Sequence, residues 1–328
     1  MSFKNELKVR QACVTGGGGF IGRALTKALL EKGIRVSVLD DFSTGNLRKT
    51  NDLQGEGDLD IVEGSVLVEG DIVKAISGCD TVYHLAAIPS VPLCEISQAQ
   101  SFIVNVEGTR KIIEACEVMA PRRVVFVSTC ALYKDRANDE EPAMESEWID
   151  PAQQFHYPMH KYIAEVLALS AHLRGNVSCS IVRPFNVVGR GQRDGGAYSA
   201  VVPAFLRMVE GGIPPTINGD GGQSRDFVPL PLVAEGILRA GTVEEAGGTI
   251  INMATAVETT INGLFEMILR ISGMNLTPSY DDGRPGEMRA MYGSTYRMRE
   301  ILGLDEELET YTLQKELEGI LEDIQQGW

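Results

Sequence analysis

The sequence predicts an α/β fold in which a doubly wound parallel sheet is covered by helices on both faces. Three observations support this prediction. Short apolar segments alternate with amphipathic ones through the first half of the chain, a glycine cluster separates the first strand from the first helix, and a carboxylate ends the second strand. Alternation of this kind favours parallel strands that are buried on both faces. Ligands of such sheets bind beyond the carboxyl ends of the strands.

The glycine cluster lies in the stretch V-T-G-G-G-G-F-I-G, which runs from Val14 to Gly22. Gly16 can adopt the backbone angles of a tight turn, and Gly19 leaves the main chain open to a diphosphate. Gly22 lets the helix that begins near Phe20 pack close to the strand. The N-terminus of that helix would direct its free N–H groups at the diphosphate. The alternative, a plain structural turn, does not explain why the cluster joins a strand to a helix.

The second strand, Arg35 to Leu39, ends at Asp40, 18 residues after Gly22. A carboxylate at this position typically binds the 2′-hydroxyl of a ribose. Asp40 and its neighbour Asp41 would repel a 2′-phosphate, so the sequence favours NAD over NADP as the cofactor. The alternative is that Asp40 only caps the following turn.

The remaining elements continue the alternation, and a looser second half follows Pro184. We expect residues 1–184 to form the dinucleotide-binding domain. Residues 185–328 should form mainly a smaller C-terminal substrate-binding lobe, with some segments returning to the core sheet. An acidic amphipathic segment, 311–324, should be a helix with a solvated outer face. The expected strands are 12–14, 35–39, 60–62, 80–85 and 123–128, and the expected helices are 20–32, 68–76, 102–118 and 157–173.

Composition limits the classes of function. The 328 residues carry a net charge of −15, which argues against a nucleic-acid partner because phosphate binding needs a basic face. Six scattered cysteines without a C-x-x-C pair indicate reduced thiols. The charged N-terminus lacks an apolar targeting core, and no apolar run could span a bilayer. We therefore expect a soluble cytoplasmic protein with no membrane partner. We expect no metal site, and His84 at a strand end should be a packed structural residue.

The spacing Y-x-x-x-K at Tyr157 and Lys161 places a phenol and an ammonium on one face of a helix. A nearby ammonium and an oxidised nicotinamide should lower the pKa of the tyrosine. Tyr157 could then take a proton from a sugar hydroxyl while hydride leaves the same carbon. Pro158 is tolerated because it falls in the first helical turn. The pair follows the strand-end residues Ser128 and Thr129 by about 28 residues.

Ten stretches occur in an order that resembles the extended short-chain dehydrogenase/reductase family, which has a Rossmann-type fold, and within it the NAD-dependent nucleotide-sugar 4-epimerases. The resemblance covers nearly the whole chain. Beside the glycine stretch, the matching segments are V-L-D-D-F-S-T-G, H-L-A-A, N-V-E-G-T, S-T-C-A-L-Y, Y-P-M-H-K, R-P-F-N-V-V-G, G-A-Y-S-A-V-V-P, I-N-G-D-G-G-Q-S-R-D-F and R-P-G-E-M-R.

The resemblance implies a role for each matching residue. Thr129 would bind the 4-oxygen of the sugar and relay its proton, Tyr157 would be the base, and Lys161 would assist it and bind the nicotinamide ribose. Arg225 and Arg284 would bind the substrate diphosphate. Alternatively, Arg225 would form a salt bridge to Asp226 or another acid. The cofactor-binding positions are Gly16, Gly19, Phe20, Ile21, Gly22, Asp40, Asp41, Ser43, Thr44, Gly45, Ser65, Val66, Leu85, Ala86, Ala87, Asn105, Tyr157 and Lys161. The substrate-binding positions are Thr129, Asn186, Tyr198, Val202, Asn218, Arg225, Arg284 and Glu287.

The chain departs from the family pattern at four places. Ser65 stands where an aspartate usually contacts the adenine, and Lys134 stands where glycine usually follows the strand-end tyrosine. Leu230-Pro231-Leu232 replaces V-D-D, which changes how the next helix is capped. His160 replaces a common serine. Each catalytic group is retained, so these departures leave the reaction in place and the substrate open.

The resemblance implies a homodimeric UDP-sugar 4-epimerase, in which helices 102–118 and 157–173 would pair across the dimer. The substrate would be of the N-acetylglucosamine/N-acetylgalactosamine or the glucose/galactose type. Met291 matches a position where size limits the C2 substituent, and it does not decide between them.

Alternatives to the epimerase remain. A 4,6-dehydratase would need acids after Thr129, where the chain has Cys130-Ala131. A fucose-synthase-like enzyme would have its cysteine one residue later. A dinucleotide-sensing protein would usually have lost Tyr157 or Lys161.

Overall fold

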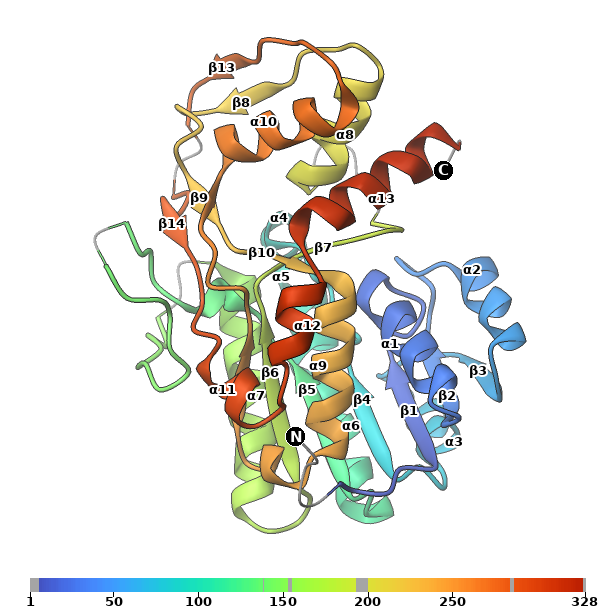
Figure 1. Cartoon of the computed structure of the whole chain (residues 1–328). Coiled ribbons are helices and arrows are strands. Elements are labelled where there is room, and N and C mark those ends of the chain that lie inside the picture. The colour runs from blue at the N-terminus through green and yellow to red at the C-terminus, as the bar shows by residue number, and fades with distance from the viewer. Residues whose placement is uncertain (1–5, 138, 153–154, 193–199, 284–285, 327–328) are drawn as a thin grey trace.

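The computed structural model describes residues 6–137, 139–152, 155–192, 200–283 and 286–326, and places a smaller lobe at one end of a helix-covered sheet (Figure 1). The strands are β1 (Gln11–Thr15), β2 (Arg35–Asp40), β3 (Leu59–Glu63), β4 (Thr81–His84), β5 (Arg123–Val127), β6 (Cys179–Pro184), β7 (Asn186–Val188), β8 (Thr216–Asn218), β9 (Ser224–Arg225), β10 (Phe227–Pro229), β11 (Ile250–Met253), β12 (Thr259–Thr260), β13 (Ser279–Asp281) and β14 (Ala290–Met291). The α-helices are α1 (Phe20–Glu31), α2 (Leu47–Asn51), α3 (Glu69–Ile76), α4 (Val91–Ile96), α5 (Gln98–Phe102), α6 (Gly108–Met119), α7 (His156–Leu173), α8 (Val201–Glu210), α9 (Leu230–Thr242), α10 (Ile261–Ser272), α11 (Tyr296–Glu300), α12 (Asp305–Thr310) and α13 (Leu313–Gln325).

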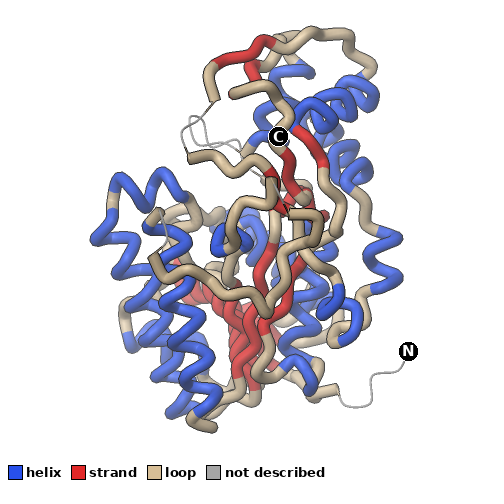
Figure 2. The backbone as a smooth tube through the Cα atoms, turned by 90° about the vertical axis from the view of Figure 1, so that its left-hand side faces the viewer, coloured by secondary structure: helices blue, strands red, loops and turns tan. Residues whose placement is uncertain are grey.

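The central sheet has seven strands in the order β11-β6-β5-β4-β1-β2-β3. Every neighbouring pair is parallel. The order reverses between β1 and β4, and in doubly wound sheets a reversal of this kind marks the ligand crevice. The predicted α/β fold is therefore confirmed. Figure 2 shows the strands between two groups of helices.

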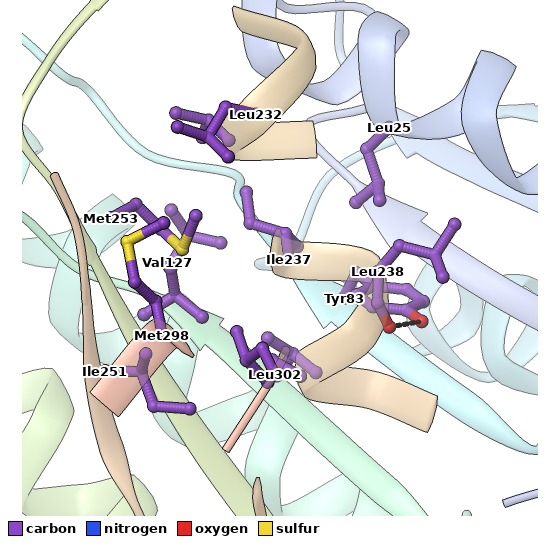
Figure 3. Packing of buried hydrophobic residues seen from close by; sticks show 14 of the residues in the cluster. Leu25, Tyr83, Val127, Leu232, Ile237, Leu238, Ile251, Met253, Met298 and Leu302 are labelled. Carbon is purple, nitrogen blue, oxygen red and sulfur yellow. Dashed lines mark hydrogen bonds between the residues drawn. The ribbon is translucent and has the colours of Figure 1, made fainter. Parts of the chain in front are cut away.

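The two faces of the sheet bury different helices, as the alternation of side chains along a strand requires. In β5, Val125 and Val127 face one core with α1 and α9, whereas Val124 and Phe126 face the other with α3, α6 and α7. Figure 3 shows part of the first core, where Leu25 of α1 and Ile237 of α9 lie near Leu302, in the turn after α11.

Helix α9 belongs to the second half of the chain but packs on strands of the first half. The hydroxyl of Tyr83 in β4 donates a hydrogen bond to the carbonyl of Leu238 at 3.1 Å (Figure 3). The guanidinium of Arg123 in β5 donates to the carbonyls of Ala240 (3.1 Å) and Val243 (3.3 Å). Strand β11 then completes the sheet beside β6.

The helix predicted over 102–118 is continuous but not uniform. Five residues, Ile103–Glu107, form a π-helical turn between α5 and α6. Such turns insert one residue per turn and often lie at functional sites. In the described part of the chain, no helix is both long and apolar enough to span a membrane.

The smaller lobe is built from α8, α10, α13 and the short strand pairs β8–β13, β9–β12 and β9–β14. The amphipathic helix predicted over 311–324 is present as α13, with one exposed face and one buried face. Leu317, Ile320 and Leu321 of α13 are buried against α8 and α10, so one face of this helix is part of the lobe core. Glu318 and Glu322 lie on the exposed face, as predicted.

Candidate active site

The glycine loop between β1 and α1 has the geometry that its sequence predicts. Gly16 has a φ of +72°, and a methyl carbon there would lie 2.7 Å from the backbone nitrogen of Ala86. A methyl carbon at Gly22 would lie 2.1 Å from the carbonyl oxygen of Gly16. Side chains at these two positions would therefore destroy the loop. Gly18, which the sequence analysis did not single out, leaves room for the ring of Phe42.

Asp40 lies at the end of β2 and reaches back to the glycine loop. Its carboxylate accepts hydrogen bonds from the backbone N–H groups of Gly18 (2.8 Å) and Phe42 (2.7 Å). Burial raises the pKa of this carboxyl group, and these two hydrogen bonds oppose the effect. Asp40 therefore braces the loop in addition to the ribose-binding role that we expect for it.

A cavity of about 720 Å³ extends from the glycine loop, past the ends of β2, β4 and β5, to the start of α7. The glycine loop, whose tight turns exclude side chains, faces this cavity, and so does the carboxylate of Asp40. These residues therefore fit a dinucleotide. The residues predicted for the cofactor that line it are Gly16, Gly19, Phe20, Ile21, Gly22, Asp40, Asp41, Ser43, Thr44, Gly45, Ser65, Val66, Leu85, Ala86, Ala87, Tyr157 and Lys161. The cavity also includes Arg23 and Gly191, which lie outside the matching stretches, and Phe185 and Val187, which lie in R-P-F-N-V-V-G but were not predicted to bind the cofactor.

Asn105, also predicted to bind the cofactor, does not line this cavity. It is buried in the π-helical turn, where its side chain accepts a hydrogen bond from the backbone N–H of Ile88 at 2.7 Å and donates one to the carbonyl of Ile88 at 3.2 Å. Ile88 itself lines the cavity. Asn105 therefore holds the loop after β4 in position.

Ser65 replaces the usual aspartate beside the adenine. Its backbone N–H donates to the carboxylate of Asp71 at 2.9 Å, and its hydroxyl accepts from the N–H of Leu67 at 3.2 Å. An acid six residues later therefore holds this loop through its main chain.

His84 has the packed structural role that its strand-end position predicts. Its Nδ1 lies 2.7 Å from the hydroxyl of Thr15, and its Nε2 lies 3.0 Å from the hydroxyl of Thr109. Burial lowers the pKa of His84 to about 3, so the ring is neutral. The ring thus links β1 to α6 beneath the cavity.

The three predicted catalytic residues lie together on the cavity wall. Thr129 follows β5, and its side chain is hydrogen-bonded to the phenol of Tyr157 in the first turn of α7. One turn further along α7, Nζ of Lys161 donates to the carbonyl of Val127 at 2.5 Å. The ammonium also lies over the ring of Phe126, 4.3 Å from its centre. Spacing of four residues places Tyr157 and Lys161 on one face, as predicted.

The electrostatics of this trio differ from the expectation. Burial lowers the pKa of Lys161 to about 8, and the charge of Glu165 opposes this shift. Burial also raises the pKa of Tyr157, and the opposing effect comes from its hydrogen bond with Thr129. In the chain alone, desolvation thus outweighs the lowering of the Tyr157 pKa that we expect from Lys161, and the effect of Lys161 together with an oxidised nicotinamide stays a prediction.

The residues predicted for the substrate are distributed over the lobe. Nη2 of Arg225 in β9 lies 3.3 Å from a carboxylate oxygen of Glu287, so two of these residues are brought together as an ion pair. Nη1 of Arg225 donates to the carbonyls of Ser224 and Met288. Asp226 instead accepts hydrogen bonds from the backbone N–H and the hydroxyl of Thr255, so the salt bridge that the alternative proposes is made with another acid, Glu287.

The other substrate positions have separate environments. Val202 is buried in the lobe core, with 1% of its surface exposed, and its expected place in the nucleotide pocket stays a prediction. Met291 is also buried. Asn186 begins β7, and Asn218 ends β8, where its carbonyl accepts from Gln223 at 2.8 Å. Tyr198 and Arg284 lie outside the described residues.

Comparison with known proteins identifies the class to which this fold and site belong. The model of the NAD dependent epimerase/dehydratase family matches residues 12–254, and the chain belongs to this family. The resemblance inferred from the motifs is thereby confirmed, and NAD is the cofactor of the family.

The relatives differ from one another in activity. UDP-glucose 4-epimerase of Mycolicibacterium smegmatis is 30% identical over 292 residues, which cover 88% of this chain and 91% of the relative. UDP-N-acetyl-alpha-D-glucosaminuronate decarboxylase of Bacillus cytotoxicus is 29% identical over 264 residues, 80% of each chain. The crystal structure of UDP-glucose 4-epimerase with UDP-glucose from Thermotoga maritima matches with a TM-score of 0.88 at 26% identity, over 96% of this chain and 99% of that one. These relatives define an NAD-dependent enzyme that modifies a nucleotide sugar.

Proposed function

We propose that this protein is a UDP-sugar 4-epimerase. The observation that carries the proposal is the trio of Thr129, Tyr157 and Lys161 on the wall of the cavity that fits the dinucleotide. Cys130 and Ala131 follow Thr129, where a 4,6-dehydratase would need acids for elimination. The trio thus supplies groups for removing and returning the proton of the 4-hydroxyl, which inversion at C4 requires besides hydride transfer.

The residues would act in a defined order. Bound NAD supplies reversible hydride transfer at C4 of the sugar. Thr129 would hold the 4-oxygen, and Tyr157 would take its proton through the hydrogen bond that joins these two side chains. Below pH 8 Lys161 is mainly an ammonium, so it favours the phenolate form of Tyr157 that must be present before this proton can be accepted. The 4-keto sugar would then rotate in the site, so that hydride returns to the opposite face of C4 while Tyr157 returns the proton, and no net oxidation occurs.

A UDP-sugar is the substrate class that we propose, with the N-acetylglucosamine and glucose types as the first candidates. Arg225 is a suitable diphosphate ligand because its planar guanidinium matches phosphate oxygens. Its present partner Glu287 is the residue that we expect at the uridine ribose, so substrate binding would separate this ion pair and give each group its own ligand.

The test is proton NMR of the purified protein with UDP-N-acetylglucosamine, UDP-glucose or UDP-glucuronate and no added NAD. We expect the anomeric signal of the C4 epimer of at least one of these sugars to grow. Tyr157→Phe should lower kcat at least about 100-fold. Tyr162→Phe, on the same helix, is the matched control and should retain activity.

Two other products would refute the proposal. A 4-keto-6-deoxy signal would identify a dehydratase. Release of carbon dioxide from a UDP-uronic acid, without a C4 epimer, would identify a decarboxylase like the relative of Bacillus cytotoxicus.

We also propose that the protein is a homodimer through α5–α6 and α7. Val118 on α6 and Leu173 on α7 are 85% and 84% exposed, and Val166 on α7 is 48% exposed. Apolar side chains gathered on adjacent helices favour association. Light scattering should give twice the chain mass for the wild type and a lower mass for Val166→Glu. A monomeric wild type at micromolar concentration would contradict the proposal.

A further inference from the structure

The first turn of α7 needs hydrogen-bond acceptors from outside the helix. The first N–H groups of any helix have no partner within it. Phe155, at the N-cap, offers no side-chain acceptor, and Pro158 has no N–H. His156 and Tyr157 therefore begin the helix without a local cap, although Tyr157 must hold its hydroxyl in one place.

Glu95 of α4 supplies the missing acceptor. One carboxylate oxygen accepts a hydrogen bond from the backbone N–H of His156 at 2.7 Å. The other lies 2.7 Å from Nδ1 of the His156 ring. A single carboxylate thus binds both the main chain and the side chain of the residue before Tyr157. Its negative charge also suits the N-terminus of an 18-residue helix.

Helix α4 is well placed to transmit this contact to the cavity. The loop that precedes it, with Ile88 and Pro89, lines the cavity, and so does Gln100 of α5. The next turn of α7 has a different contact with the same region. The ring of His160 packs edge-on against Phe102 of α5, with 5.5 Å between ring centres. The cavity wall and the helix that bears Tyr157 are therefore joined at two points.

We propose that Glu95 is a positioning residue for Tyr157, which it holds in reach of Thr129 and the sugar through its two-point contact with His156. This inference rests on the proposed function for its effect on turnover. The pair is partly exposed, with 34% of the Glu95 side chain and 31% of the His156 side chain accessible. Exposed pairs add little stability. The consequence of losing the pair should therefore appear in catalysis more than in folding.

The test compares Glu95→Ala and Glu95→Gln with Ser90→Ala. Ser90 caps the same helix, α4, by accepting from the N–H of Leu93 at 3.4 Å, so its loss loosens α4 without touching α7. Glu95→Ala should lower kcat about tenfold, because small misplacements of reacting groups are costly, and leave KM within twofold. Glu95→Gln retains one acceptor and should recover most of kcat. Ser90→Ala should have the kcat and KM of the wild type.

A second readout does not depend on turnover. Protein labelled with carbon-13 at tyrosine Cζ contains nine tyrosines, and Tyr157→Phe identifies the signal of Tyr157. In Glu95→Ala this signal should move or broaden, whereas Ser90→Ala should leave it in place. An unmoved Tyr157 signal in Glu95→Ala refutes the inference, as does an equal loss of kcat in Ser90→Ala. A moved signal in a protein that converts none of the UDP-sugars would refute only the proposed function.

Discussion

Replacing Lys161 with methionine should stabilise the chain while it abolishes activity. Lysine has an ordinary pKa of 10.5, and burial lowers the pKa of Lys161 to about 8, so the folded protein holds the ammonium at a cost of about 3 kcal/mol. Methionine fills a similar space without charge. It loses the hydrogen bond to the carbonyl of Val127, worth about 1 kcal/mol, which leaves a net gain of about 2 kcal/mol at pH 7.

The pH dependence gives this prediction a sign that can be checked. Between pH 8 and 10.5 the unfolded chain binds a proton at Lys161 that the folded chain does not, so wild-type stability rises with pH relative to the variant. The advantage of Lys161→Met should therefore shrink by about 1.4 kcal/mol per pH unit across this range and reverse at about pH 9.5.

The assay is urea unfolding of nucleotide-free protein at pH 7 and pH 10, with Lys27→Met as the control. Lys27 is an exposed lysine, so its replacement should change the free energy of unfolding by less than about 0.5 kcal/mol. A Lys161→Met protein that is less stable than the wild type at pH 7, or a difference that does not vary with pH, would show that burial does not penalise this ammonium.

Three further predictions concern the sheet and the cofactor loop. Glu165→Ala should lower the free energy of unfolding, measured in urea, by about 3–5 kcal/mol, because it leaves the buried charge of Arg183 without its partner. Arg183 and Glu165 lie 2.6 Å apart, and both side chains are 2% exposed. Gly22→Ala places a methyl carbon 2.1 Å from a carbonyl oxygen and should weaken NAD binding at least about tenfold by calorimetry. Asp40→Asn should weaken NAD binding and raise the relative affinity for NADP, because it removes the charge that repels a 2′-phosphate; unchanged cofactor preference would contradict this role.

The first half of the fold could be predicted because its signals are local. Strand β5, R-V-V-F-V, is buried throughout and ends within one residue of the expected boundary. The turn at Gly16 and the close approach at Gly22 follow from the absence of a side chain, which is visible in the sequence. The placement of Tyr157 and Lys161 on one face of α7 could be predicted for the same reason, because a four-residue spacing gives it within the helix itself.

The second half depends on contacts that are distant in the chain. Strands β9 and β14 have two residues each, and they exist because they pair across the lobe. The sequence of α13 shows an apolar stripe but not the helices α8 and α10 that cover it. The acidic residues therefore predicted the solvated face of α13, whereas the partners of its buried face could not be predicted.

The candidate site could likewise be predicted where its signals are local, but not where it depends on distant contacts. Residue types and spacing predicted which side chains gather at the strand ends. They did not predict the pKa of Tyr157, because that value depends on how much of the fold surrounds the phenol. The contact of Glu95 with His156 joins positions 61 residues apart, so the spacing of neither residue indicates it.

The return of α9 and β11 to the sheet has a consequence for synthesis on the ribosome. A nascent chain that has reached Pro184 still lacks two carbonyl groups that accept hydrogen bonds in the folded protein. They are the carbonyl of Leu238, which accepts from Tyr83, and the carbonyl of Ala240, which accepts from Arg123. The nascent chain also lacks the strand that pairs with β6. At typical translation rates these partners emerge roughly 3–14 s later. During that interval apolar surface on β4, β5 and β6 stays uncovered, which makes the unfinished chain a client for holding chaperones.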